Sequence, residues 1–158
     1  MGKKKRNEEI IYGRRPVLES MRAGRRKVHG LVVRDGVRTS PELDAVMRLA
    51  DRQGVRVREL SAKEIDRMCG GGNHQGLAAV VTPYPYVSPR EIGELKREGN
   101  DPLVLVLDHL EDPQNVGSIL RTADAVGVTG VIIAERRAAG ITPAAVRASA
   151  GAAEHIPV

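Results

Sequence analysis

The stretch from Leu103 to Ile133 constrains the fold more than any other part of the sequence. It reads LVLVLDHLEDPQNVGSILRTADAVGVTGVII and has a short apolar run at each end. Residues 103–107 have the composition of a buried strand, and residues 131–134 have that of its neighbour in a parallel sheet. The segment between the runs has room for one helix. The pattern therefore predicts a strand, loop, helix, strand unit of an α/β fold.

The helix inside this unit has signals at both ends. Asp112 is a good N-cap acceptor, Pro113 suits the first helical position, and Gly127 suits the end. The loop before such a helix lies at the carboxyl ends of the strands, where open α/β sheets bind ligands. Here that loop contributes four polar side chains that could be metal ligands or ordinary turn residues: Asp108, His109, Glu111 and Asp112.

Upstream of this unit, alternating patterns predict a smaller α/β domain. The strongest helix starts are Ser40-Pro41 and the capping-box pair Ser61 and Glu64. The predicted order is helix, strand, helix, strand, helix, strand, over residues 17–22, 28–33, 41–53, 55–60, 61–68 and 77–82. Prolines at 83, 85, 89 and 102 then bracket one short polar helix, and we interpret this stretch as a linker. The predicted organisation is a basic disordered arm, a first domain, a linker and a second domain, at residues 1–8, 9–82, 83–101 and 102–158.

The charge of the chain is concentrated at its front. Residues 1–34 carry eleven lysines and arginines against three acids, whereas the rest carries fourteen against seventeen. A basic arm that leads into a folded unit favours a polyanion partner such as nucleic acid, although a short basic run can also be a solvated tail. The candidate RNA contacts are Lys3, Lys4, Lys5, Arg6, Arg14, Arg15 and Arg34, and Arg25, Arg26 and Lys27 add to the basic character of the folded region.

Composition limits the remaining possibilities. Aromatic residues make up 2% of the chain, too few for an extended platform on which single-stranded bases stack, so RNA contacts must rest on phosphate charge and shape. The sequence contains no long apolar span and no secretory pattern, so we expect a cytoplasmic protein without membrane association. The lone Cys69 cannot form an internal disulfide and is expected to pack near a turn.

A glycine cluster at residues 70–76 invites comparison with phosphate-binding loops. It follows a predicted helix, precedes a predicted strand and lacks the lysine of a P-loop, so that interpretation is weak. Two alternatives remain open. The cluster is a flexible turn into the strand at Leu77, or it offers His74 and Gln75 to RNA from a mobile loop.

The C-terminal region suggests an unfinished sheet. Thr142-Pro143 starts a helix that Gly151 ends, and the last residues resemble the beginning of a third strand. A parallel sheet normally has both faces covered, so two strands and a stub would leave apolar surface and open edges. We therefore expect that the second domain is incomplete. The missing layers come either from residues beyond Val158 or from a partner, and we favour residues beyond Val158.

The segment DPQNVGSILRTADAVGVTGVII resembles the first motif of the SpoU (TrmH-like) family of RNA ribose methyltransferases, which has an Asn, a Gly and an Arg in this register. Three further segments are similar to the subgroup that methylates a guanosine ribose in 23S ribosomal RNA. They are IYGRRPVLE, HQGLAAVV and SAGAAEHIPV, and all four occur in family order.

The resemblance implies both fold and chemistry. The first domain would be a ribosomal-protein-like RNA-binding domain, and the second would be the N-terminal part of a parallel α/β methyltransferase domain of the SPOUT type, whose C-terminal part is tied in a trefoil knot. The family binds S-adenosylmethionine in the knot, acts as a homodimer and needs no metal. The substrate would be ribosomal RNA, with transfer RNA as an alternative. The cofactor-binding residues are expected beyond Val158, so this chain alone is expected to be inactive.

The resemblance also assigns the catalytic residues. Asn115 matches the asparagine of the motif and Arg121 matches the arginine to which activation of the ribose hydroxyl is assigned. A free guanidinium is a very poor base, so we expect Arg121 to orient the 2′-hydroxyl and stabilise developing oxyanion charge. From the pattern alone, Asn115 could be a helix cap and Arg121 a solvated surface residue. The competing hypothesis for the whole chain is a non-enzymatic RNA-binding module.

Overall fold

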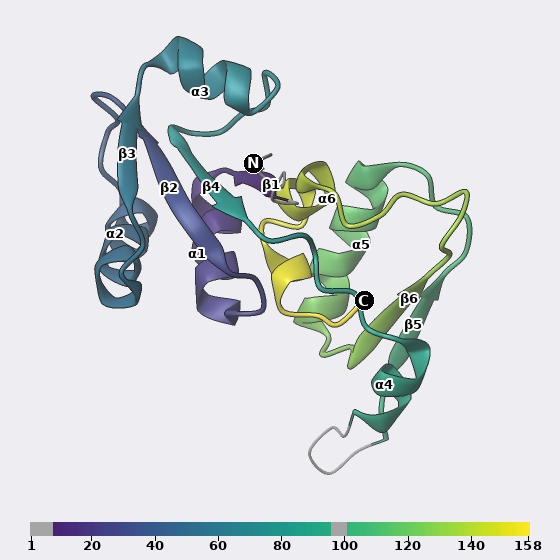
Figure 1. The fold of residues 1–158 in the computed structure, drawn as a ribbon. Coiled ribbons are helices and arrows are strands. Elements are labelled where there is room, and N and C mark those ends of the chain that lie inside the picture. The colour runs from purple at the N-terminus through teal and green to yellow at the C-terminus, as the bar shows by residue number, and fades with distance from the viewer. Residues whose placement is uncertain (1–7, 96–100) are drawn as a thin grey trace, which may run out of the picture. The chain divides into compact units, whose positions relative to one another are not determined.

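The chain folds into two compact units, residues 1–83 and 84–158. The structure is a computed structural model that describes residues 8–95 and 101–158 (Figure 1). Each unit has its own sheet and its own helices, and each is α/β, as the sequence predicts. The two units are therefore described one at a time.

The first unit is built on a four-stranded mixed sheet. The strand order is β1-β4-β2-β3, with β2 and β3 parallel and the other neighbours antiparallel. The strands are Glu9–Tyr12 (β1), Val28–Arg34 (β2), Val57–Leu60 (β3) and Leu77–Val81 (β4). Three of the four were predicted. The edge strand β1 was missed because four residues next to a charged arm carry little pattern, and only pairing with β4 makes them a strand.

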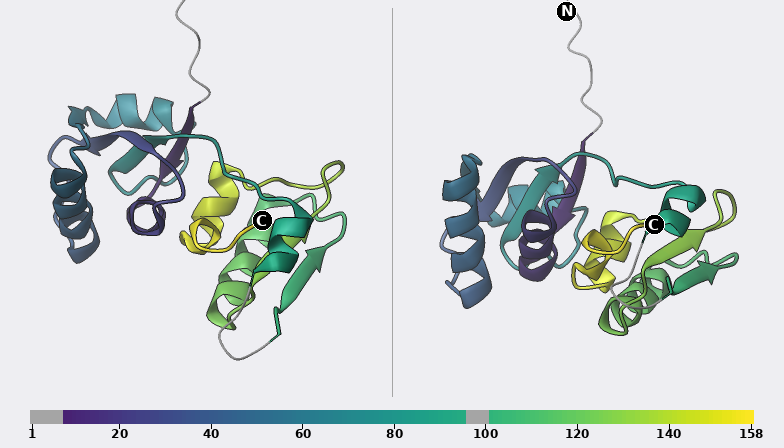
Figure 2. Two further views of the ribbon diagram at one scale, coloured as in Figure 1. Left: turned by 60° about the horizontal axis from the view of Figure 1, so that its bottom comes forward. Right: turned by 90° about the horizontal axis from the view of Figure 1, so that it is seen from below.

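Three helices cover this sheet, and each was predicted, the second with its observed ends and the other two with shifted ends. They are Arg14–Ala23 (α1), Pro41–Gln53 (α2) and Ala62–Met68 (α3). The predicted starts at Ser40 and Ser61 hold, because the Ser40 hydroxyl accepts from the backbone N–H of Leu43 and Ser61 forms a capping box with Glu64. Figure 2 shows α1 and α2 on one face of the sheet and α3 over the other.

Side chains that alternate along the strands pack on both faces of the sheet. Val32 and Ala78 are register partners, and they pack with Ile65 of α3. Their neighbours Leu31 and Ala79 face the opposite side, because successive side chains of a strand alternate. The inward stripes of α1 and α2 complete that second layer, with buried residues Val17, Leu18, Met21, Leu43, Val46 and Ala50.

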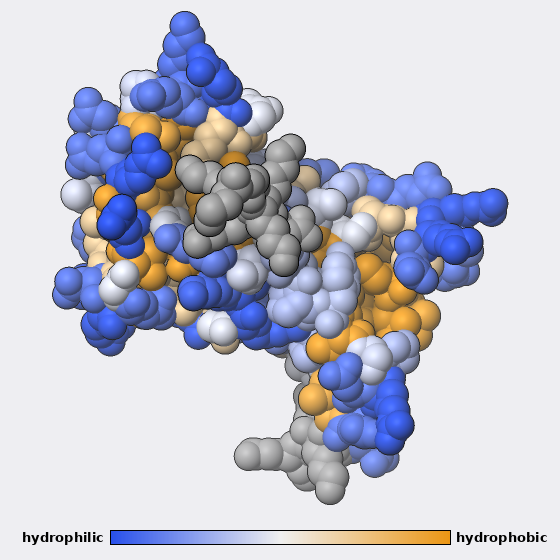
Figure 3. All heavy atoms as spheres, viewed as in Figure 1, coloured by the Kyte–Doolittle hydropathy of each residue, from blue (hydrophilic) through white to orange (hydrophobic). Residues whose placement is uncertain are grey.

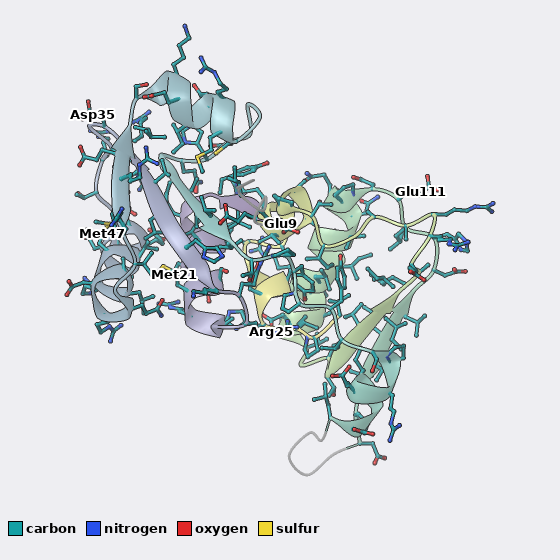
Figure 4. The ribbon with its side chains drawn as sticks, viewed as in Figure 1. Glu9, Met21, Arg25, Asp35, Met47 and Glu111 are labelled. Carbon is teal, nitrogen blue, oxygen red and sulfur yellow. The ribbon has the colours of Figure 1, made fainter. Side chains whose placement is uncertain are left out.

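The helices of this layer keep an apolar face inward and a polar face in solvent. Met21 of α1 is 3% exposed, whereas Met47 of α2 is 40% exposed (Figure 4). Each helix has buried residues on the side that covers the sheet. The first unit has apolar cores on both faces of its sheet.

The second unit contains the predicted strand, loop, helix, strand segment. Val104–Leu107 (β5) and Gly130–Ile133 (β6) form a two-stranded parallel sheet, and Pro113–Ala125 (α5) connects them. Pro143–Ala148 (α6) packs against α5, and a short 3-10 turn, Ala152–Glu154 (η1), follows it. The last residues were predicted to begin a third strand. The prediction of a strand is not confirmed, because the described residues after η1 form no strand. Two backbone hydrogen bonds hold the end of the chain, from the N–H of Val131 to the carbonyl of Pro157 and from the N–H of Val87 to the carbonyl of Val158.

The contact between α5 and α6 depends on Gly117. A Cβ at this position would lie 2.5 Å from the carbonyl oxygen of Ala145 and 2.5 Å from the Cβ of Ala148. Real Cβ contacts do not reach such distances, so only glycine lets the two backbones approach this closely. The glycine of the NVG motif therefore has a packing role.

Part of the segment predicted as a linker belongs to the second unit. Tyr84 is buried, and its hydroxyl donates to the carbonyls of Ala153 (2.9 Å) and Ile156 (2.8 Å). Pro89–Glu94 forms a short helix (α4) that buries Ile92. The short helix predicted inside the linker corresponds to α4, and Tyr84 and Ile92 of this segment are buried in the second unit.

Candidate functional site

Helix α5 carries the two predicted catalytic residues. The Asp112 carboxylate accepts from the backbone N–H of Gln114 at 2.9 Å, and Pro113 occupies the first turn. Asp112 is therefore the N-cap, which leaves Asn115 as the third helical residue without a capping role. Asn115 therefore lies in the first turn of α5, just after the loop that follows β5.

Asn115 and Arg121 are both exposed. They are six positions apart, which corresponds to about 9 Å along the helix axis and about 120° around it. The structure does not bring their side chains onto one face. Within the described residues, neither side chain forms a hydrogen bond or an ion pair. Both groups are therefore available to a substrate or to other chain segments.

The carboxylate-rich loop before α5 lies beside the loop that follows β6. The backbone N–H of Ala139 donates to the carbonyl of Leu110 at 2.7 Å and joins the two loops. Glu111 projects outward near this junction (Figure 4), while Asp108 contacts the imidazole of its neighbour His109. Among residues 8–95 and 101–158, no group of three or more His, Cys, Asp and Glu side chains could hold a metal ion.

An apolar cavity of about 540 Å³ lies beside β6 in the second unit. Figure 3 shows apolar surface over this part of the unit. Its lining residues are Tyr86, Val87, Pro89, Ile92, Val131, Ile132, Ile133, Ala134, Glu135, Ala138, Gly140 and Val158.

The volume is that of a small-molecule site, but the donor set does not fit S-adenosylmethionine. The lining contains no lysine or arginine for the carboxylate of the cofactor, and Glu135 is its one charged side chain. The prediction that the cofactor-binding residues lie beyond Val158 therefore stays a prediction.

The predicted RNA-contacting residues of the first unit differ in their exposure and in their partners. Lys3, Lys4, Lys5 and Arg6 lie outside the described residues. Arg15 is exposed on α1. Arg26, in contrast, is 3% exposed, pairs with the Glu9 carboxylate and donates to the carbonyl of Thr82 at 2.8 Å. A guanidinium engaged in this way is part of the structure of the unit and is not offered to RNA.

The remaining predicted residues converge on one polar cavity of about 550 Å³, which we call the arginine cavity. It is formed by the start of α1, the turn after β2, α3 and the glycine-rich loop before β4. Its lining residues are Arg14, Arg34, Val37, Arg38, Asp66, Gly71, Gly72, Asn73, His74, Gln75 and Gly76.

Arg14 ties three of these segments together. Its Nε donates to the carbonyl of Gln75 at 3.2 Å and its Nη2 donates to the carbonyl of Arg38 at 2.7 Å. Its backbone N–H also donates to Oε1 of Gln75 at 3.1 Å. Arg14 therefore braces the cavity, and two of the N–H groups of its guanidinium are already engaged.

His74 fixes the glycine-rich loop from beneath. It is 8% exposed, its Nδ1 accepts from the backbone N–H of Gly76 at 2.9 Å, and its Nε2 lies 2.8 Å from Oδ1 of Asp66. Since Nδ1 accepts, the ring proton belongs on Nε2 and is donated to Asp66. His74 thus lies in the wall of the cavity, and its two hydrogen bonds hold the glycine-rich loop in place at this residue.

Two guanidinium groups in the cavity remain uncommitted. The side chains of Arg34, which is half-buried, and Arg38, which is exposed, form no hydrogen bond or ion pair with the described residues. Arg38 was not predicted. The sequence feature that could have identified it is RDGVR, in which Arg34 and Arg38 stand on either side of a turn. Asp35, labelled in Figure 4, lies in that turn.

Cys69, next to the cavity, has no chemical role there. It is a buried free cysteine, and burial raises the pKa of its thiol to about 11, with a smaller contribution from the Asp66 carboxylate. The thiol is therefore protonated at neutral pH and a weak nucleophile. This agrees with the expectation of a thiol packed near a turn.

Sequence families match the two units separately. A family described as RNA 2′-O ribose methyltransferase substrate binding matches residues 10–87, and the SpoU rRNA methylase family matches residues 102–158. The chain is 39% identical over 151 residues to a Bacillus subtilis protein named as a TrmH-family tRNA/rRNA methyltransferase, covering 95% of this chain and 59% of that protein. An uncharacterized tRNA/rRNA methyltransferase of Mycolicibacterium vanbaalenii is 39% identical over 157 residues, covering 99% and 50%.

Solved structures give the same result for the fold. The AdoMet-bound rRNA methyltransferase of Sinorhizobium meliloti matches with a TM-score of 0.72 and 25% identity, over 96% of this chain and 53% of that one. The SpoU methyltransferase AviRb of Streptomyces viridochromogenes, in complex with AdoMet, matches with a TM-score of 0.73 and 25% identity, over 99% and 56%. The chain thus spans about half the length of these relatives. No helix in the described part of the chain is long and apolar enough to span a membrane.

Proposed function

Because the chain belongs to the SpoU family of RNA methyltransferases, we propose that its gene product transfers a methyl group from S-adenosylmethionine to a ribose 2′-hydroxyl of ribosomal RNA. The observation that carries this proposal is the pairing of a substrate-binding match with a methylase match, one on each unit. The relatives solved with AdoMet support the choice of cofactor.

The proposed chemistry uses Arg121 and Asn115 as groups that act on RNA. In the reaction a bond forms between the methyl carbon and the ribose oxygen, the bond from that carbon to the sulfonium sulfur breaks, and the hydroxyl proton leaves to solvent. Arg121 orients the hydroxyl and stabilises the negative charge that develops on its oxygen. Since a guanidinium stays protonated, Arg121 does not act as the base. It is exposed and has no partner among residues 8–95 and 101–158, which leaves it free for this contact.

Asn115 is the second polar group on the helix, and we propose that it helps to position the ribose. The backbone carbonyl of Asn115 accepts from the Ser118 hydroxyl at 3.0 Å. Its side-chain amide has no hydrogen-bond partner among the described residues and is therefore left for the substrate. Asn115 and Arg121 differ by about 120° in direction around the helix axis. A bound nucleotide that contacts both must therefore extend around part of the circumference of α5.

The finer assignments rest on the resemblance of the sequence to its family. We propose a 23S guanosine as the target, a homodimer as the active form and the cytoplasm as the location. The basic N-terminal residues and the arginine cavity would supply the phosphate contacts of the substrate-binding unit.

A direct test uses the full product of the gene with S-adenosylmethionine and, in parallel, ribosomal and transfer RNA. We expect 2′-O-methylated guanosine in digested ribosomal RNA, identified by mass spectrometry. Methylation of a base would contradict the proposed chemistry. RNA binding without any methyl transfer would instead favour a binding module, and modification of transfer RNA alone would reassign the substrate.

A further inference from the structure

The arginine cavity has the features of a binding site for part of an RNA chain, and we propose that it holds one unpaired nucleotide of the RNA substrate. The inference rests on the proposed function and makes it more specific. The nucleotide bound here is a recognition element, and it is distinct from the nucleotide that is methylated.

The first argument is charge. Three arginines and one aspartate line the cavity. Arg14 already donates to two backbone carbonyls, and the Asp66 carboxylate already accepts from His74. The two guanidinium groups left over belong to Arg34 and Arg38, and both are pure donors of the kind that bind phosphate.

The second argument is size and rigidity. A cavity of about 550 Å³ falls within the range of small-molecule sites, which is the scale of one nucleotide. Its walls are held in place before any ligand arrives by the hydrogen bonds of Arg14 and His74. Because the walls are already ordered, binding a ligand here has only a small free-energy cost for immobilising protein side chains.

The third argument is the lining chemistry. Oε1 of Gln75 is occupied by the N–H of Arg14, so the amide nitrogen of Gln75 is left to donate to an acceptor on a base edge. His74 contributes the one aromatic ring of the lining, but that ring is 8% exposed and lies in the wall with both nitrogens engaged. The planar groups available for base stacking are therefore the guanidinium groups of Arg34 and Arg38. A base inside a duplex is already paired and stacked, so only an unpaired nucleotide could enter.

The experiment compares two blunt-ended RNA duplexes that differ by one bulged nucleotide. Binding to the 158-residue chain is measured by fluorescence anisotropy at several salt concentrations. We expect the bulged duplex to bind about tenfold more tightly than the paired one. Arg38→Ala and Arg34→Ala should each remove most of this preference. Each should also reduce the slope of log affinity against log salt concentration by about one, the value expected for the loss of one phosphate contact.

The matched control is Arg48→Ala, an exposed arginine of α2 that does not line the cavity. It should keep the preference. Arg38 is exposed, so its substitution should not disturb folding, and a circular dichroism melt of each variant checks this.

Equal binding of the two duplexes by the wild-type chain would overturn the inference. A preference that survives the Arg34→Ala/Arg38→Ala double substitution would also overturn it. If the duplexes bind equally while the gene product still methylates RNA, the nucleotide site is wrong and the proposed function stands. If the preference is present but no methylation occurs, the function is wrong and the site stands.

Discussion

The two units present their candidate functional residues in different ways. In the first unit, side chains from four segments meet around one cavity, and hydrogen bonds of Arg14 and His74 lock them together. In the second unit, Asn115 and Arg121 lie on one helix, exposed and without partners among the described residues.

The difference separates recognition from chemistry. A site whose walls are internally bonded can select a ligand on its own, whereas a pair of solvated side chains needs other groups to hold the reacting atoms in position. We therefore expect substitutions in the first unit to change RNA affinity, and substitutions on α5 to change the rate of methyl transfer.

The largest effect on stability should come from Gly117→Ala. The added Cβ would meet backbone atoms of α6 at 2.5 Å, so the helices must separate. We expect a loss of about 1–3 kcal/mol in the unfolding free energy of the second unit, measured by urea denaturation. The matched control is Gly93→Ala in α4, where a Cβ meets nothing within 4 Å. There we expect no loss. Equal behaviour of the two variants would show that α5 and α6 do not pack this closely.

The next effect compares two histidine and aspartate pairs. His74→Ala removes a buried ring with two hydrogen-bond partners and should destabilise the first unit by about 1–3 kcal/mol. His109→Ala removes an exposed ring that contacts Asp108, and the loss should be below about 1 kcal/mol. Thermal melts of both variants test the contrast. A His74→Ala chain as stable as wild type would mean that the wall of the arginine cavity is not held by this residue.

The smallest effect concerns pH and is shared by the two units. Hydrogen bonds from the side chain and then the backbone of Ser61 lower the pKa of Glu64, and those from the backbone and then the side chain of Ser88 lower the pKa of Glu91. This stabilisation is complete above the ordinary glutamate pKa of 4.5 and is lost as pH falls through the lowered values. Acid titrations followed by circular dichroism should therefore shift slightly in Glu64→Gln and Glu91→Gln. Superimposable titrations of wild type and both variants would exclude these caps as stabilising elements.

Local signals predicted most of the fold. The starts of α2, α3, α5 and α6 follow from Ser40, Ser61, Asp112 and Thr142, since a cap depends on residues within one turn of helix. Strand β1 depends on a partner about seventy residues away, and no pattern within four residues can report that pairing. The segment at Tyr84 was assigned to a linker for the same reason, because its contacts are with residues 153 and 156.

The two candidate sites also differ in whether they depend on one sequence segment or on several distant ones. Asn115 and Arg121 could be chosen from one contiguous motif, and the structure adds that they do not share a helix face. The arginine cavity could not be assembled from the sequence, because it needs α3, the turn after β2, the start of α1 and the loop before β4 at once. The sequence therefore named Arg14, Arg34, His74 and Gln75 without showing that two of them brace the cavity.

The division between recognition and chemistry is tested most directly by steady-state kinetics of the full gene product on its RNA with saturating S-adenosylmethionine. Arg34→Ala/Arg38→Ala should raise KM for RNA about tenfold and leave kcat unchanged. Arg121→Ala should lower kcat by about 10²–10³ and leave KM unchanged. Wild-type turnover by Arg121→Ala, or a fall in kcat caused by the cavity substitutions, would contradict the account.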